Sequence, residues 1–151
     1  MRVLLATDGT IYSNAAIEAI YLFNLKTGDE IKVVSVVDLA VPLSVDIYTG
    51  YLPSTIEIEN AARESAIITL EKTRSKLEES FSKTEIIITT EVLFGSPDSR
   101  IVETAEVMKA DLIIVGSHGY NSWERLLLGS VSDSVVHHAP CSVFVVRTAK
   151  Q

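Results

Sequence analysis

Cysteine is nearly absent from this sequence of 151 residues, in which Cys141 is the single thiol. One thiol can form neither an intrachain disulfide nor a cysteine-based metal cage. We therefore expect Cys141 to be a small buried side chain, which is the usual state of a free cysteine.

The sequence also has no run rich in lysine or arginine, and its net charge is -7. The electrostatic attraction that drives binding to nucleic acid or to anionic membranes is therefore missing. No stretch of about 18 apolar residues is present to cross a bilayer. Asp8 interrupts the first apolar segment before a signal sequence is complete. These absences predict a cytoplasmic protein that binds neither nucleic acid nor membranes.

What the sequence does contain is the composition of one globular domain. Hydrophobic residues make up 47% and charged residues 22% of the chain, a balance that argues against disorder and against a coiled coil. The length is close to the commonest domain size, and no internal repeat, low-complexity tract or linker divides it. We predict a single domain that spans residues 1–151.

Hydrophobic periodicity predicts strands that alternate with helices along the whole chain. The predicted strands span residues 2–7, 30–37, 85–93, 111–115 and 142–146. The predicted helices span residues 13–25, 54–81, 96–108 and 130–138. Residues 38–53 carry proline, glycine and tyrosine without a clear period and predict a long loop. The alternation favours an α/β fold with three layers, in which helices cover both faces of a doubly wound, five-stranded parallel sheet.

Ligands of such sheets bind beyond the carboxyl ends of the strands, where the strand order reverses. Among the loops at that edge, residues 116–130 contain three glycines. Gly116 and Gly119 lack side chains that would block an anion from the backbone amides, and glycine adopts positive φ at little cost. Gly129 and Ser130 open the last predicted helix, where unpaired N–H groups and the helix dipole favour phosphate. These features are typical of a polyphosphate site.

The spacing Gly-x2-Gly-x9-Gly-Ser from Gly116 to Ser130 resembles the nucleotide-binding pattern of the universal stress protein family. The similarity extends to Asp8-Gly9-Thr10, to the turn Gly95-Ser96-Pro97 and to the closing segment 131–147. The resemblance implies the ATP-binding subgroup of that family. It also implies an adenine nucleotide alpha hydrolase-like (Rossmann-like) fold with strand order 3-2-1-4-5.

The resemblance further implies a set of binding residues, with Asp8 near the ribose, the Val36 backbone near adenine and the glycines around the phosphates. The ligand is expected to be ATP, or ADP or AMP, with Mg²⁺ carried on the phosphates. The implied nucleotide-binding residues are Thr7, Asp8, Val36, Gly116, Ser117, His118, Gly119, Arg125, Gly129, Ser130, Val131 and Ser132. Because no positioned base for attacking water is visible in the sequence, we expect a stress-response or signalling module with at most slow ATP hydrolysis and no catalytic residue.

Several of these residues have a simpler interpretation. Asp8 can form an Asx-turn with the two residues that follow it, and Arg125 can be an exposed loop residue. His118 is a single imidazole without a partner in the sequence, so we do not assign it to catalysis. His137 and His138 are adjacent on a predicted helix and point in different directions, so we predict no metal site there.

The rival function is a dimeric interaction or signalling protein of the same fold, for which nucleotide binding is incidental or absent. In the order that the resemblance implies, the apolar segment Ser142–Val146 is an exposed sheet edge, and such edges tend to associate. We therefore expect a homodimer through this strand. The sequence lacks the Walker motif of P-loop NTPases and the glycine motif of dinucleotide-binding dehydrogenases. Leu93-Phe94-Gly95 offers no aspartate as the acceptor that a receiver domain needs.

Overall fold

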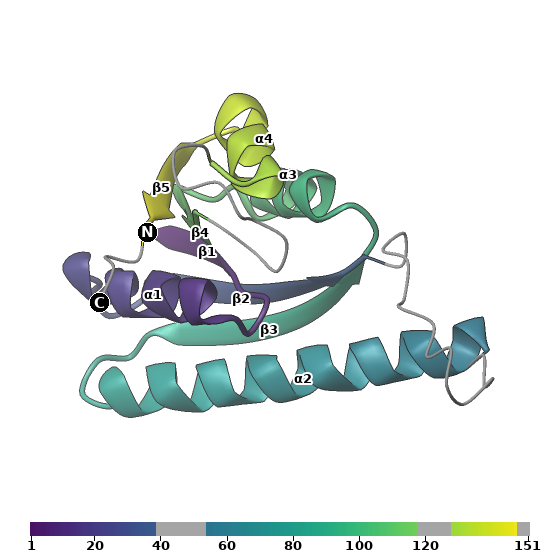
Figure 1. The fold of residues 1–151 in the computed structure, drawn as a ribbon. Helices are drawn as coiled ribbons and strands as arrows, with labels where there is room; N and C mark the ends of the chain where they lie inside the picture. The colour runs from purple at the N-terminus through teal and green to yellow at the C-terminus, as the bar shows by residue number, and fades with distance from the viewer. Residues whose placement is uncertain (39–53, 118–127, 148–151) are drawn as a thin grey trace.

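The computed structural model describes residues 1–38, 54–117 and 128–147 (Figure 1). The strands are β1 (Arg2–Ala6), β2 (Glu30–Val37), β3 (Ile87–Phe94), β4 (Leu112–Gly116) and β5 (Ser142–Val146). The helices are α1 (Ile11–Ala19), the short 3-10 helix η1 (Ile20–Leu22), α2 (Thr55–Ser80), α3 (Pro97–Met108) and α4 (Ser130–His138). The predicted bounds of β2, α4 and β5 are confirmed.

All neighbouring strands pair in parallel, and their order is β3-β2-β1-β4-β5. The chain therefore moves outward from β1 to β3 and then returns to place β4 on the other side of β1. The predicted order 3-2-1-4-5 is confirmed. The reversal between β1 and β4 is the switch point at which such sheets bind ligands.

Alternate residues of the central strands face two separate helical layers. Leu5 and Val33 pack with residues of α1 and α2, whereas Leu4 and Ile113 pack with residues of α3 and α4. Figure 1 shows α1 and α2 on one side of the sheet and α3 and α4 on the other. Because successive side chains of a strand point to opposite faces, one continuous apolar strand fills both layers of the core.

The largest difference from the predicted bounds is in the first helix, which was expected at residues 13–25. Thr10 accepts a hydrogen bond from the Ser13 amide at 3.4 Å, so α1 begins at Ile11. The helix then tightens into η1, and Phe23 is extended. The prediction was wrong at both ends because the N-terminal cap and the 3-10 turn leave no trace in the apolar period.

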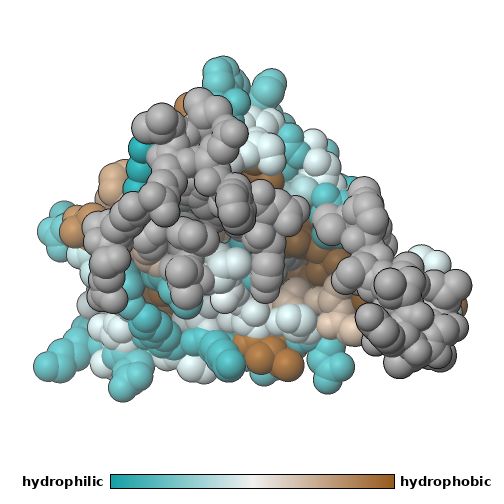
Figure 2. Space-filling view, viewed as in Figure 1, coloured by the Kyte–Doolittle hydropathy of each residue, from teal (hydrophilic) through white to brown (hydrophobic). Residues whose placement is uncertain are grey.

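The long helix α2 begins with a capping box, in which Ser54 and Glu57 each bond the other's backbone amide. Its outward surface in Figure 2 is mainly hydrophilic, interrupted by a small hydrophobic spot. Its charged residues therefore form the solvated face that the sequence predicts. Residues 39–53, which precede it and make up most of the predicted loop, lie outside the described residues.

Candidate functional site

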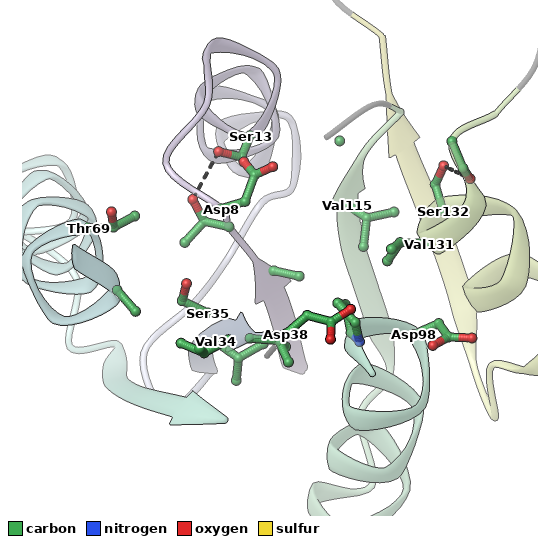
Figure 3. A pocket seen from close by; sticks show the side chains of 18 of the residues that line it. Asp8, Ser13, Val34, Ser35, Asp38, Thr69, Asp98, Val115, Val131 and Ser132 are labelled. Carbon is green, nitrogen blue, oxygen red and sulfur yellow. Dashed lines mark hydrogen bonds between the residues drawn. The ribbon is translucent and has the colours of Figure 1, made fainter. Parts of the chain in front are cut away.

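A cavity of about 730 Å³ opens at the carboxyl ends of β1, β2 and β4. It is bounded on one side by α2 and on the other by the first turns of α3 and α4 (Figure 3). It therefore lies at the switch point of the sheet, where the sequence places the ligand. Of the predicted binding residues, eight line the cavity: Thr7, Asp8, Val36, Gly116, Gly129, Ser130, Val131 and Ser132.

Of the remaining predicted residues, only Ser117 is described, and it does not line the cavity. Ser117 is 1% exposed and lies behind the wall, where its carbonyl accepts a hydrogen bond from the Gly129 amide at 2.9 Å. His118, Gly119 and Arg125 lie outside the described residues.

The first turn of α4 borders the cavity and lacks a side-chain cap. The N-cap residue is Gly129, which has no side chain to accept the amides that follow it. The amides of Ser130, Val131 and Ser132 have no acceptor within the helix, because the first intrahelical bond joins the Asp133 amide to the Gly129 carbonyl. The helix therefore presents three bare N–H groups at this cavity wall.

The conformation of Gly129 corrects one part of the expectation from sequence. Its φ is -62° and its ψ is 154°, values open to any residue. Gly116 is also absent from the glycines with positive φ, which in the described chain are Gly9, Gly28 and Gly95. At residues 116 and 129 glycine is therefore not required by backbone strain, and the missing side chain is what distinguishes it.

The Ser132 hydroxyl braces the same turn. It lies 2.9 Å from the Gly129 carbonyl and 3.1 Å from the Ser117 carbonyl, and Ser132 is 3% exposed. Its single proton is shared between these acceptors. We conclude that this side chain holds the end of β4 against the start of α4, a positioning role that the sequence did not distinguish from ligand contact.

Asp8 combines the two interpretations that the sequence left open. Its Oδ1 accepts hydrogen bonds from the Thr10 amide at 3.0 Å and from the Thr10 hydroxyl at 2.7 Å, which is an Asx-turn. Its Oδ2 has no hydrogen-bond partner among the described residues, and Asp8 lines the cavity. The turn thus orients the carboxylate and leaves one oxygen for a ligand hydroxyl. Thr7, by contrast, uses its hydroxyl to donate to Ser13 at 3.0 Å.

Asp98 is a cavity residue that the sequence analysis missed. Its carboxylate accepts hydrogen bonds from the Ser96 hydroxyl at 2.5 Å and from the Ser134 hydroxyl at 2.7 Å. These two bonds hold the pKa of Asp98 below its ordinary value. Because Ser134 belongs to α4, the carboxylate ties the first turn of α3 to the helix that carries the bare amides.

Replacing Asp98 by alanine is expected to lower the free energy of unfolding by about 1 kcal/mol at pH 7. Because the folded-state pKa is lowered, the carboxylate contributes stability that is present above the unfolded value of about 3.9. That stability is lost as the pH falls through the folded-state pKa. Urea unfolding of the wild type and Asp98→Ala checks this. A difference in stability that is as large at pH 3 as at pH 7 would contradict it.

A stripe of small residues on α2 also lines the cavity, whereas from sequence its alanines were predicted only as part of the apolar face of the long helix. Ala62, Ser65, Ala66 and Thr69 line the cavity and follow the i, i+3, i+4, i+7 spacing of one helix face. This spacing was visible in the sequence. Small side chains at regular helical spacing leave room for a neighbouring group along that face of the helix. The larger apolar residues of the same helix indicate only that it packs against the core.

The described lining is acidic. It includes the carboxylates of Asp8, Asp38 and Asp98 and contains no lysine, arginine or histidine. Within the described residues, no group of three or more His, Cys, Asp or Glu side chains is placed to hold a metal ion. His137 and His138 each place Nδ1 2.8 Å from the carbonyl four residues earlier on α4. Each of these rings therefore contacts the backbone of its own helix through Nδ1.

Two further expectations concern the rest of the chain. Cys141 is half-buried rather than fully buried, because β5 lies at the sheet edge. Desolvation, with a smaller contribution from Asp111, raises the pKa of its thiol. None of the helices in the described ranges is long and apolar enough to span a membrane.

The fold defines a doubly wound α/β protein, with a cavity at the strand ends of its switch point. The family model of the universal stress proteins matches residues 1–147, and the chain belongs to that family. A putative universal stress protein of Staphylococcus aureus (strain USA300) is 52% identical over 62 residues. That alignment covers 40% of this chain and 37% of the relative, well under half of the relative's length.

Solved structures agree with the fold. The universal stress protein UspA from Lactobacillus plantarum superimposes with a TM-score of 0.71 at 22% identity, over 97% of each chain. A universal stress protein family member from Arabidopsis thaliana, solved with AMP bound, has a TM-score of 0.61 at 17% identity. That match covers 99% of this chain and 92% of the plant protein.

Proposed function

We propose that this protein binds ATP, or a related adenine nucleotide, in the cavity at the switch point of its sheet. The observation that carries the proposal is the uncapped first turn of α4, where the amides of Ser130, Val131 and Ser132 have no acceptor among the described residues. Three such amides at the positive end of a helix dipole suit phosphate oxygens.

The other helix starts at this edge argue for α4 as the phosphate site. The first turn of α1 is capped by Thr10 and lies next to Asp8. The first turn of α3 has Pro97 at its first position and the Asp98 carboxylate beside it. Each of these turns therefore has fewer free amides or a carboxylate at the cavity, whereas Asp133, the acidic residue in the first turn of α4, does not line the cavity. The nucleotide would place its phosphates at α4 and its ribose at the free Oδ2 of Asp8.

A divalent cation suits this arrangement. Asp8, Asp38 and Asp98 make the cavity acidic, so a polyphosphate needs its charge reduced. Mg²⁺ retains most of its waters and binds through phosphate oxygens, so it needs few protein ligands. The ion would supply charge neutralisation. We assign no base for attacking water, so ATP turnover is expected to be slow or absent.

Titration calorimetry with ATP, ADP and AMP tests the proposal. We expect a Kd for Mg-ATP in the micromolar range, which corresponds to about -8 kcal/mol. Chelation of Mg²⁺ with EDTA should weaken ATP binding more than AMP binding, because ATP carries more phosphate charge past the three carboxylates. Mass spectrometry of nucleotide released from freshly purified protein identifies the bound species. No heat and no thermal shift at millimolar ATP would contradict the proposal.

A homodimer is the second part of the proposal. The strand β5 ends the sheet, and its neighbourhood exposes apolar side chains, with Phe144 36% and Val136 44% exposed. An apolar sheet edge favours pairing with a second copy. Light scattering should therefore report twice the 16.5 kDa chain mass. Val145→Pro removes one N–H of the edge strand and should lower that mass. A wild-type particle of 16.5 kDa at micromolar concentrations would count against the dimer.

A further inference from the structure

Ser35 on β2 is a buried hydroxyl without a partner. The residue is 5% exposed, and its side chain makes no hydrogen bond to any described residue. Other equally buried hydroxyls in the described chain are paired: Thr7 with Ser13, Thr73 with the Thr69 carbonyl, and Ser132 with two carbonyls. A buried hydroxyl left unpaired is costly and uncommon. Ser35 therefore calls for a partner outside the chain.

The position of Ser35 shows where that partner would lie. Ile31 and Val33 precede it on the same face of β2 and pack in the core beneath α1 and α2. Ser35 continues this face into the cavity. Figure 3 shows its side chain on β2, in the space bordered by Thr69 of α2 and by Asp8. This end of the cavity lies on the opposite side of Asp8 from α4.

The walls around Ser35 are small and polar. Thr69 lies so close to the loop after β1 that a Cβ added at Gly9 would sit 2.9 Å from its Oγ1. Ala62 and Ala66 line the cavity along the same face of α2. Small side chains leave room for a flat group, and the hydroxyls of Ser35 and Thr69 can each donate or accept a hydrogen bond. We call this part of the cavity the α2 arm, defined by Ser35, Ala62, Ala66 and Thr69.

The family resemblance already implies a base beside Val36 of β2. Given the proposed function, we infer that the Ser35 hydroxyl, which faces the α2 arm, is a specificity-determining contact to the edge of that base. Phosphates at the start of α4, beside β4, and ribose at Asp8, after β1, leave β2 and α2 as the next position along the sheet. The step from β4 across β1 to β2 is about 10 Å. An adenine edge offers both a donating amine and accepting ring nitrogens to a hydroxyl.

The test compares Ser35→Ala with wild type for ATP, AMP, adenosine and ribose 5-phosphate, which lacks a base. Loss of one neutral hydrogen bond should weaken ATP, AMP and adenosine by the same factor, roughly threefold to tenfold. Ribose 5-phosphate should bind both proteins equally, which also shows that the variant keeps its site. Purine riboside, which lacks the amine, and 7-deazaadenosine, which lacks N7, then identify the base atom that Ser35 contacts. The analogue that lacks the contacted atom should bind wild type more weakly than adenosine does. The same analogue should bind Ser35→Ala as tightly as adenosine does.

Thr73→Val is the matched control. Thr73 lies on α2, four residues after Thr69, and is 4% exposed. Its hydroxyl already donates a hydrogen bond to the Thr69 carbonyl. This variant should leave all four affinities unchanged. Unchanged AMP affinity in Ser35→Ala, or an equal loss for ribose 5-phosphate, would overturn the inference while leaving the proposed function standing. A wild type that binds none of the adenine ligands would overturn the proposed function and the inference with it.

Discussion

Replacing Gly129 by valine is expected to abolish ATP binding while leaving the fold intact. The φ of -62° and ψ of 154° at this residue are accessible to valine, so the backbone is not strained. The branched side chain would instead occupy the space beside the bare amides of Ser130, Val131 and Ser132. Loss of two charge-assisted hydrogen bonds amounts to at least about 3 kcal/mol, or more than a hundredfold in Kd.

The ligand series makes this result specific. Adenosine carries no phosphate, so its affinity for Gly129→Val should stay within about threefold of wild type, a difference smaller than one hydrogen bond to a charged group. Gly129→Ser is the complementary variant. A serine at the N-cap accepts a first-turn amide and should add a few tenths of a kcal/mol of stability, yet it competes with phosphate and should weaken ATP. Intact ATP affinity in a folded Gly129→Val protein would contradict the phosphate assignment.

Replacing Gly9 by alanine is expected to disturb both stability and nucleotide binding. Gly9 has a φ of +78°, which costs a residue with a side chain about 1–2 kcal/mol. The added Cβ would also lie 2.9 Å from Thr69 Oγ1 and 3.3 Å from Thr69 Cγ2. A threonine side chain has little rotational freedom in a helix, so the loop that carries Asp8 must move. We expect AMP affinity to fall at least tenfold, the equivalent of about 1.4 kcal/mol.

Gly28 provides a matched control for the backbone effect alone. Its φ is +89°, and a Cβ there would meet nothing within 4 Å. Gly28→Ala should therefore lose a similar amount of stability from strain and keep its AMP affinity. Thr69→Ala leaves only the Thr69 Cβ, at 3.7 Å, so Gly9→Ala should weaken AMP binding much less in a Thr69→Ala background than in wild type. Denaturant unfolding and calorimetry on these variants check the result. Equal affinity losses in Gly9→Ala and Gly28→Ala would contradict the steric explanation.

The local pattern of the sequence determined which segments form strands and helices and how these alternate along the chain. Runs of β-branched residues such as Glu30–Val37 and Ser142–Val146 fit a pleated, partly buried strand. Strand and helix alternate along the chain, and crossover handedness and helix packing then leave few arrangements besides a parallel sheet. The site loops followed from the same logic, because the ends of parallel strands share one edge.

Only the tertiary structure decided which groups at that edge are already satisfied. Asp98 and Ser134 are 36 residues apart, and their hydrogen bond exists because α3 and α4 pack on the same face of the sheet. The Asx-turn of Asp8 was visible as a motif, whereas its free Oδ2 was not. A periodic pattern shows that a residue faces inward, and it does not show what that residue meets there.

The α2 arm shows the same division most plainly. The small-residue stripe of α2 and the serine on β2 are both present in the sequence, where residues 36–61 separate Ser35 from Ala62. Whether Ser35 is paired, as Thr73 is, or unpaired at a cavity wall depends on which side chains the packed helix brings to it. The periodicity of the sequence therefore determined the alternation of strands and helices and the sheet edge that carries the candidate site. Whether a buried polar group has a hydrogen-bond partner was decided by the tertiary structure, because that partner often comes from a distant segment of the chain.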